Sequence, residues 1–230
     1  MKNFVFDLYG TLVDISTDEE SARFIKKVNA YFSKLGVENF YTRYTNLCRG
    51  LGGGEEDSEI DISAVFSTLL GGNAELAKRA ALSFRALSRG RLGLYRGVLP
   101  LLKKLKDGGA ELYILSNAQS CFTVAEIEQL GIAEYFGGIC LSSDFGAKKP
   151  SARFFNHIIE RFGLDKSQTV YVGNDFKADI CGAEGVGLAA AYVKSNISPR
   201  GDSVEEAAGI AAFATDSFKD LSRYLLSILT

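Results

Sequence analysis

The sequence contains few of the residues on which histidine or zinc chemistry depends. His157 is the single histidine, so a Ser-His-Asp triad would need this residue, which we interpret as structural or surface-exposed because it lies on a predicted amphipathic helix. The cysteines are widely spaced, with no Cys-x-x-Cys pair, and a zinc site is not expected. Free thiols instead indicate a reducing, cytoplasmic setting. The four cysteines are Cys48, Cys121, Cys140 and Cys181.

The chain also lacks a basic excess and a long apolar run. Its 26 Lys and Arg against 28 Asp and Glu give a formal net charge of −2, so we expect no nucleic-acid partner. No run of 18 apolar residues is present, and the short apolar start ends at Asp7, so we expect neither a membrane span nor a signal peptide. The 230 residues suit one domain, or one core with a smaller insert.

Short apolar runs alternate with amphipathic ones along most of the chain. Apolar residues on successive positions are typical of parallel strands that are covered on both faces. Helical patterns between such strands indicate βαβ crossovers, so we predict an α/β fold with a Rossmann-like, doubly wound parallel sheet. The predicted strands are 4–6, 112–115, 138–141, 170–172 and 188–193, and the predicted helices are 98–106, 121–130, 150–162, 178–184 and 215–230.

One segment, residues 16–92, interrupts this alternation because it contains no convincing strand. We interpret it as an α-helical cap domain inserted after the first strand into a core formed by 1–15 and 93–230. Both ends of the insert lie near the end of that strand, so it can cover a site there. Its predicted helices are 18–36, 40–50, 60–71 and 73–89, with a glycine-rich segment at 51–59.

Polar residues follow four of these predicted elements. Asp7 follows strand 4–6, and Ser116-Asn117 follow the next strand. Lys149 lies in a later loop, and Asn174-Asp175 follow strand 170–172. Because ligands of open parallel sheets bind beyond the carboxyl ends of the strands, we expect these side chains to share one site.

Four motifs at these positions give the sequence a specific family resemblance. The sequence resembles the haloacid dehalogenase superfamily of hydrolases, in particular its members with a helical cap inserted after the first motif. The four motifs occur in the same order as in the family and together span nearly the whole core. The motifs are FDLYGTLVD (6–14), LYILSNAQ (112–119), GAKKP (146–150) and VGNDFKADICGA (172–183).

The resemblance implies that Asp7 is the nucleophile. A carboxylate between an apolar strand and a turn with Gly10 can attack phosphorus or carbon and form a covalent ester. Thr11 would offer its hydroxyl, and the turn its N–H groups, to an anion. Ser116 would donate a second hydroxyl, and Asn117 would orient Ser116 or the substrate.

A lysine completes the predicted catalytic set. A cation next to the nucleophile can neutralise charge on the nucleophile and on the transferred group. Lys148 and Lys149 are both available, and the resemblance places the functional lysine directly before Pro150. We therefore assign the role to Lys149 and expect Lys148 to point to solvent.

The resemblance also implies a Mg²⁺ cofactor. Its ligands would be the Asp7 carboxylate, the backbone carbonyl of Tyr9 and an acid in the last motif, since Mg²⁺ prefers oxygen ligands. Asn174 stands where the family carries Asp, so we predict Asp175 as the third ligand and Asn174 as the alternative. Asp179 would support Lys149 or a metal-bound water, and its alternative role is to cap the next helix.

Tyr9 is the main departure from the family's phosphatases, which carry a general acid/base Asp at this position. A phenol, with a pKa of about 10, cannot replace that Asp. The 2-haloacid dehalogenases of the superfamily do carry Tyr here, need no metal and bind substrate through an early cap arginine. Arg43 and Arg49 are candidates for that arginine, and the alternative is that both lie on a solvated helix face.

We predict a Mg²⁺-dependent phosphatase that acts on a small phosphorylated metabolite through an aspartyl-phosphate on Asp7. The acidic residues of the last motif favour this function, because a metal-free enzyme has little reason to keep them. The alternatives are a 2-haloacid dehalogenase-type hydrolase of C–halogen bonds and a non-catalytic protein that binds a phosphorylated ligand. The partner would be a small-molecule substrate, and the protein would be a monomer or a homodimer.

Overall fold

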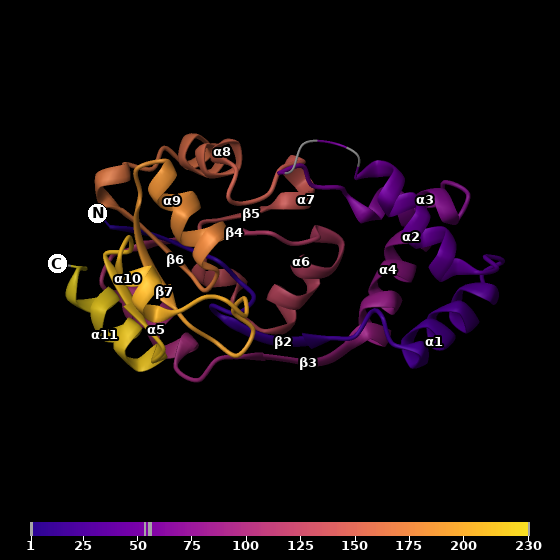
Figure 1. The fold of residues 1–230 in the computed structure, drawn as a ribbon, viewed down its shortest axis with the longest axis horizontal. Coiled ribbons are helices and arrows are strands. Elements are labelled where there is room, and N and C mark those ends of the chain that lie inside the picture. The colour runs from indigo at the N-terminus through magenta and orange to yellow at the C-terminus, as the bar shows by residue number, and fades with distance from the viewer. Residues whose placement is uncertain (1, 53, 55–56, 230) are drawn as a thin grey trace.

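A computed structural model describes residues 2–52, 54 and 57–229. Its centre is a six-stranded parallel sheet (Figure 1), which confirms the predicted α/β class. In register, Phe6 lies between Ile114 and Val172, and the two neighbouring strands continue one or two residues beyond this level, to Ser116 and Gly173. The order across the sheet is β5 (Gly138–Leu141), β4 (Glu111–Ser116), β1 (Asn3–Phe6), β6 (Thr169–Gly173), β7 (Ala189–Val193) and β8 (Phe213–Thr215).

Both faces of this sheet are covered, as the continuous apolar strands predict. Phe4 and Phe6 of β1 pack in one apolar cluster, and Val5 packs in a second cluster on the opposite face. The first cluster contains α5 (Val98–Asp107) and α11 (Phe218–Ser227), and the second contains α8 (Ala152–Phe162) and α9 (Gly182–Gly185). The remaining short elements are α7 (Ser142–Phe145), α10 (Val204–Ala208), and the 3₁₀ turns Ala133–Tyr135 and Lys166–Gln168. Helix α6 (Ser120–Gln129) follows β4 in the chain and lies against α4 and α7.

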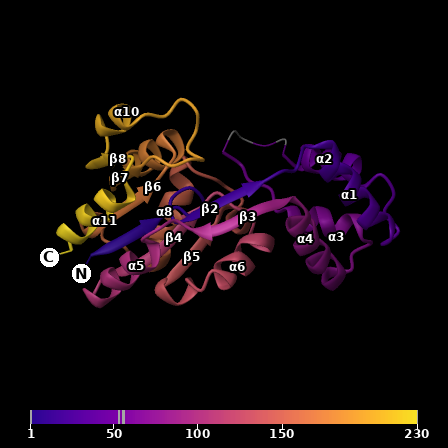
Figure 2. The same cartoon turned by 90° about the horizontal axis from the view of Figure 1, so that it is seen from below.

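Four helices form a separate helical unit beyond one end of the sheet, at the right of Figure 1 and again in Figure 2. They pack around their own aromatic core, in which Phe32, Phe40, Phe66 and Phe84 are fully buried. Side chains at helix starts stabilise the unit, since Ser21 and Asn73 accept backbone N–H groups as N-caps. The helices are α1 (Ala22–Ser33), α2 (Phe40–Leu51), α3 (Ile62–Leu69) and α4 (Ala74–Ser88).

A two-stranded antiparallel sheet joins this helical unit to the core. It pairs β2 (Val13–Thr17) with β3 (Arg89–Leu94). The prediction that residues 16–92 contain no strand is therefore wrong at both ends of the segment. The sequence gives only a weak strand signal for β3, because it reads RGRLGL, in which charged residues and glycines interrupt any apolar run.

Two further predictions need correction near the last two motifs. The predicted helix 178–184 is a π-helical turn, Phe176–Cys181, followed by the short α9. The predicted helix 150–162 begins only at Ala152, with Ser151 at the N-cap position, so Pro150 lies outside α8. None of the described helices combines the length and the apolar character needed to cross a membrane.

Candidate active site

The carboxyl ends of three strands bring the predicted site residues together. Asp7 directly follows β1, Ser116 ends β4, and Asn174 follows β6. A cavity of about 220 Å³ lies at this edge of the sheet, where ligands of parallel sheets bind. Its lining residues are Asp7, Tyr9, Ser116, Asn117, Lys149, Asn174, Asp175, Ala178, Asp179, Ile197 and Pro199.

Asp7 is buried at the base of this cavity, with 6% of its surface exposed. Its Oδ1 atom accepts hydrogen bonds from Ser116 Oγ at 3.0 Å and from Lys149 Nζ at 2.8 Å. Among the described residues, its Oδ2 atom accepts only one long hydrogen bond, from Thr11 Oγ1 at 3.4 Å. Oδ2 is therefore the oxygen with lone pairs left to attack an electrophile or to bind a cation.

Lys149 is 3% exposed and donates to three groups. Besides Asp7, its Nζ contacts Asp179 Oδ1 at 2.6 Å and the Tyr171 hydroxyl at 2.8 Å. Burial by itself lowers the pKa of Lys149, but Asp179 and Asp7 more than offset this and raise the pKa above its usual value. The ammonium group is therefore charged at neutral pH. Lys148, by contrast, is half-buried and forms no ion pair with the residues that the structure describes.

Asp179 connects Lys149 to the turn after β6. The carboxylate is 1% exposed, and its Oδ1 accepts from Lys149 and from the Tyr171 hydroxyl at 2.9 Å. Its Oδ2 accepts the backbone N–H groups of Asn174 and Asp175, both at 3.0 Å. Asp179 does not cap the following helical turn, because Asp175 is the N-cap. Tyr171 was not predicted as a site residue, since it looked like an ordinary apolar strand position.

Gly10 and Asn174 pack tightly beside Thr11. The Thr11 hydroxyl lies 3.2 Å from Asn174 Oδ1, and the Asn174 amide donates to Ser198 Oγ at 3.3 Å. Gly10 has φ +92°, and a Cβ atom there would come within 2.3 Å of Asn174 Nδ2. Only glycine fits this position. Asp7 Oδ2 and Asn174 Oδ1 therefore both lie within 3.4 Å of the Thr11 hydroxyl.

The groups in the Asp7 cavity that could bind a metal cation all offer oxygen atoms. Asp175 accepts the Ala178 N–H with Oδ1 at 2.7 Å, which leaves its Oδ2 available, and burial raises the pKa of this carboxyl. No three His, Cys, Asp or Glu side chains within 2–52, 54 and 57–229 form a metal site by themselves. A cation would therefore also need the Asn174 amide oxygen or a backbone carbonyl such as that of Tyr9. Mg²⁺ fits such a set, because it binds few protein oxygens and keeps several waters.

Asn117 positions the backbone of the lysine loop. Its amide donates to the Lys149 carbonyl at 3.0 Å, and its Oδ1 accepts the Lys149 N–H at 2.7 Å. We predict that Asn117 orients Ser116 or the substrate; in the structure its amide nitrogen and its Oδ1 both bind the backbone of Lys149.

The Tyr9 side chain extends toward the helical unit. Its hydroxyl donates to the Glu126 carboxylate and lies 3.1 Å from Thr123 Oγ1. The Arg85 guanidinium lies 5.8 Å from the centre of the Tyr9 ring. Burial, together with the neighbouring Glu126, raises the pKa of Tyr9 well above its usual value. The phenol therefore stays protonated, and its proton is directed at Glu126.

Glu126, on α6, joins the core to the helical unit. It is 2% exposed and accepts from Arg85 at 2.8 and 3.2 Å and from Arg89 at 3.1 Å. Burial alone raises the pKa of Glu126, but the hydrogen bonds from Arg85 and Tyr9 hold it below its usual value. This network has no signal in the sequence, because nothing in the amphipathic pattern of α6 shows that one Glu faces two arginines 37 and 41 residues away.

A second contact between the helical unit and the core lies beside Lys149. The Lys148 N–H donates to the Asp57 carbonyl at 2.8 Å, and the Glu59 N–H donates to the Gly146 carbonyl at 3.2 Å. The Glu59 carboxylate also accepts from Ser142 Oγ at 2.9 Å. The loop that carries Lys149 is thus packed against the segment between α2 and α3.

The two predicted substrate-binding arginines are not at this cavity. Arg43 and Arg49 are exposed on α2, and Arg49 donates to Asn46 at 3.2 Å. Neither lines the cavity around Asp7. This placement matches the alternative of a solvated helix face.

Comparison with known proteins assigns a family. Residues 1–187 match the family described as haloacid dehalogenase-like hydrolase. The chain belongs to this family. Four-fifths of the chain therefore follow one family pattern, and both the Asp7 and the Asp179 motifs lie within it.

Known relatives of this haloacid dehalogenase-like hydrolase include phosphatases. Glyceraldehyde 3-phosphate phosphatase of Methanothermobacter thermautotrophicus is 30% identical over 121 residues, which cover 53% of this chain and 54% of that protein. Phosphoglycolate phosphatase of Agrobacterium fabrum is 27% identical over 175 residues, covering 74% and 71%. The match thus spans about half the length of the first relative. The magnesium-bound structure of putative HAD-hydrolase YfnB from Bacillus subtilis shares the fold, with a TM-score of 0.58, 20% identity and coverage of 97% and 98%.

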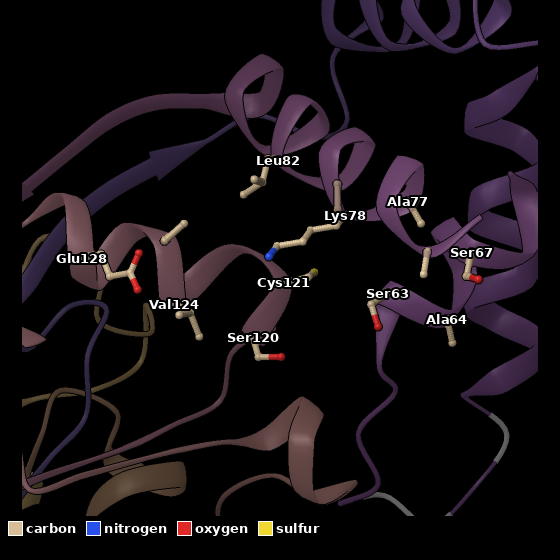
Figure 3. A pocket seen from close by; sticks show the side chains of 13 residues that line it. Ser63, Ala64, Ser67, Ala77, Lys78, Leu82, Ser120, Cys121, Val124 and Glu128 are labelled. Carbon is tan, nitrogen blue, oxygen red and sulfur yellow. The ribbon is translucent and has the colours of Figure 1, made fainter. Parts of the chain in front are cut away.

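A larger cavity in this haloacid dehalogenase-like hydrolase lies between α3, α4 and α6 (Figure 3). Its volume is about 630 Å³, and Lys78 extends across it toward α6. Its one thiol is not a ready nucleophile, because burial raises the pKa of Cys121 to about 12. None of the predicted site residues lines it; the lining consists of Ser63, Ala64, Ser67, Ala74, Ala77, Lys78, Ala81, Leu82, Ser120, Cys121, Val124, Ala125 and Glu128.

The ionisation of Asp7 gives a testable prediction. Burial raises the pKa of Asp7 to about 6, although Lys149 opposes this. We expect carbon-13 NMR of the metal-free protein to show Asp7 titrating near pH 6, with Asp7→Asn to assign the signal. Because the folded pKa exceeds the unfolded value of 3.8, ionising Asp7 lowers the free energy of unfolding as pH rises from about 4 to 6. A midpoint near 4 would contradict this prediction.

The Glu126 network gives a prediction about stability. We expect Glu126→Ala to lower the free energy of unfolding by about 3–5 kcal/mol in urea denaturation, because two arginines lose a buried partner. The matched control is Asp220→Ala, which removes a carboxylate from the exposed pair with Arg223 at 2.7 Å and should change stability by about 0.5 kcal/mol or less. Equal effects of both variants would show that the buried network does not stabilise the fold.

Proposed function

We propose that this hydrolase is a Mg²⁺-dependent phosphatase that acts on small phosphorylated metabolites through an aspartyl-phosphate on Asp7. The main support is the environment of that carboxylate. Lys149 and Ser116 hold one oxygen of Asp7, while the other oxygen is available at the cavity. A positioned carboxylate with a free lone pair beside a buried cation suits covalent transfer of an anionic group.

Each surrounding group has a role in this proposal. Asp7 Oδ2 attacks phosphorus, the hydroxyls of Ser116 and Thr11 hold the Asp7 carboxylate in place, and the charge of Lys149 stabilises the negative phosphoryl group. Mg²⁺ held by Asp7, Asp175, and the Tyr9 carbonyl or Asn174 would supply positive charge between nucleophile and phosphate. Asp179 keeps Lys149 in place.

The relatives and the helical unit support the same function. Two relatives are named as phosphatases of small phosphorylated compounds, and one structural neighbour binds magnesium. In our proposal residues 16–92 act as a cap that excludes bulk water from the cavity. We further propose a cytoplasmic protein, monomeric or homodimeric, with no nucleic-acid or membrane partner; the four free cysteines suit that compartment.

One observation favours a second candidate, a 2-haloacid dehalogenase. The Tyr9 proton is directed at Glu126, and a departing halide needs no proton. The positions of Arg43 and Arg49 do not support this candidate, since neither reaches the cavity.

A single assay separates the candidates. We would measure hydrolysis of 4-nitrophenyl phosphate and acetyl phosphate with Mg²⁺ and with EDTA, and chloride release from 2-chloropropionate. Phosphate release that EDTA abolishes is the expected result. EDTA-resistant chloride release would establish the dehalogenase instead. Thermal stabilisation by inorganic phosphate without turnover of any compound would indicate a non-catalytic binding protein.

A further inference from the structure

Few groups around Asp7 are available to give a proton to a departing oxygen. The Ser116 hydroxyl donates to Asp7, and the Thr11 hydroxyl lies between Asp7 and Asn174. The ammonium group of Lys149 has three N–H donors, and it has three partners at 2.6 to 2.8 Å. These donors hold the nucleophile and its neighbours, and none is free for a leaving group.

The remaining titratable groups of the cavity are also engaged. The Tyr9 hydroxyl donates to Glu126, on the side of the helical unit. Both oxygens of Asp179 accept hydrogen bonds from other groups. Asp175 uses one oxygen to cap the next turn, and the proposed function places its other oxygen on the cation. Among the described residues that line this cavity, no acid is left to protonate a leaving group.

We infer that the site acts on phosphoryl donors whose leaving group is stable as an anion. Such donors are acyl, enol and aryl phosphates, in contrast to phosphate esters of simple alcohols. This inference rests on the proposed function, and it narrows the substrate class from phosphorylated metabolites in general to activated ones.

The chemistry of the first step explains this preference. A bond forms between Asp7 Oδ2 and phosphorus while the bond from phosphorus to the leaving oxygen breaks, and the leaving oxygen keeps the electron pair. A carboxylate, enolate or phenolate delocalises that pair, whereas an alkoxide would need a proton. Water then attacks phosphorus, the bond to Asp7 breaks, and the products are inorganic phosphate, the Asp7 carboxylate and one proton released to solvent or to the departed anion.

The test is a series of substrates that differ mainly in the leaving group. With Mg²⁺ present, kcat/KM would be measured for 4-nitrophenyl phosphate, phenyl phosphate, glycerol phosphate and acetyl phosphate. Since a general acid contributes about 10²–10⁴-fold, we expect glycerol phosphate to be slower than 4-nitrophenyl phosphate by at least about 10²-fold, with phenyl phosphate between them and acetyl phosphate among the fast substrates. Equal values of kcat/KM across the series would overturn this inference and leave the proposed function intact. If no member reacts, the proposed function fails and this inference fails with it.

Two variants locate any hidden acid. Phenyl and 4-nitrophenyl phosphate have nearly the same shape, so the ratio of their rates reports on protonation more than on binding. We expect this ratio to be the same in wild type, Tyr9→Phe and Asp175→Asn, whatever each change does to the individual rates. If a variant loses activity on phenyl phosphate but not on 4-nitrophenyl phosphate, the substituted residue is the proton donor, and the inference is overturned.

Discussion

We expect Asp7→Asn to reduce phosphate-ester turnover by about 10⁴-fold or more, the order of loss seen when a covalent nucleophile is removed. An amide of the same shape can keep the hydrogen bond from Ser116, but it has no anionic oxygen with which to attack phosphorus. Because the pKa of Asp7 is raised by burial, its charge opposes folding above pH 6. The variant should therefore be at least as stable as wild type at pH 8.

The control for this experiment is Asp14→Asn, the same change a few residues along the first motif. Asp14 binds Arg91 at 2.7 Å and Asn196 at 3.1 Å at the surface, and it does not line the cavity. We expect it to keep the wild-type rate. Turnover that survives in Asp7→Asn, measured with purified protein and 4-nitrophenyl phosphate, would contradict nucleophilic catalysis by Asp7.

The core fold could be predicted because its signals are local. Each central strand is a short run of buried apolar residues, so strand positions and the parallel class follow from the sequence. Elements that depend on tertiary contacts were missed. Strand β8 has only three residues, and β3 gains its strand geometry from pairing with β2 rather than from its own RGRLGL sequence.

The positions of the site residues could be predicted for the same reason, whereas their partners could not. The strand ends place Asp7, Ser116 and Asn174 at one edge of the sheet, and this placement does not depend on which groups their side chains contact. The direction of Tyr9 depends on Glu126, which faces it from another helix. Likewise, Asn117 binds the backbone of a residue 32 positions away, and no pattern of residue types encodes such a pair. The strand pattern in the sequence therefore locates the reactive side chains, whereas their hydrogen-bond partners in the structure determine which protons are free to take part.

The second large effect concerns Lys149. We expect Lys149→Met to lower the free energy of unfolding by about 3–5 kcal/mol at pH 8, because Asp7 and Asp179 are left buried without their cation. This is a large part of the roughly 5–15 kcal/mol that stabilises a typical domain. Turnover should be lost as well, since the neutral side chain no longer stabilises the phosphoryl group.

The dependence of this loss on pH distinguishes electrostatics from packing. Lys149 lowers the pKa of Asp7, so without the cation the carboxyl binds its proton more tightly, and the penalty for keeping it charged is largest above its pKa. We therefore expect the difference in unfolding free energy between Lys149→Met and wild type to be smaller at pH 5 than at pH 8. The neighbouring change, Lys148→Met, removes a cation that has no buried ion-pair partner among the described residues, and it should alter stability by about 0.5 kcal/mol or less at both pH values. An equal loss at pH 5 and pH 8 in Lys149→Met would mean that shape, and not charge, is what this lysine contributes to the fold.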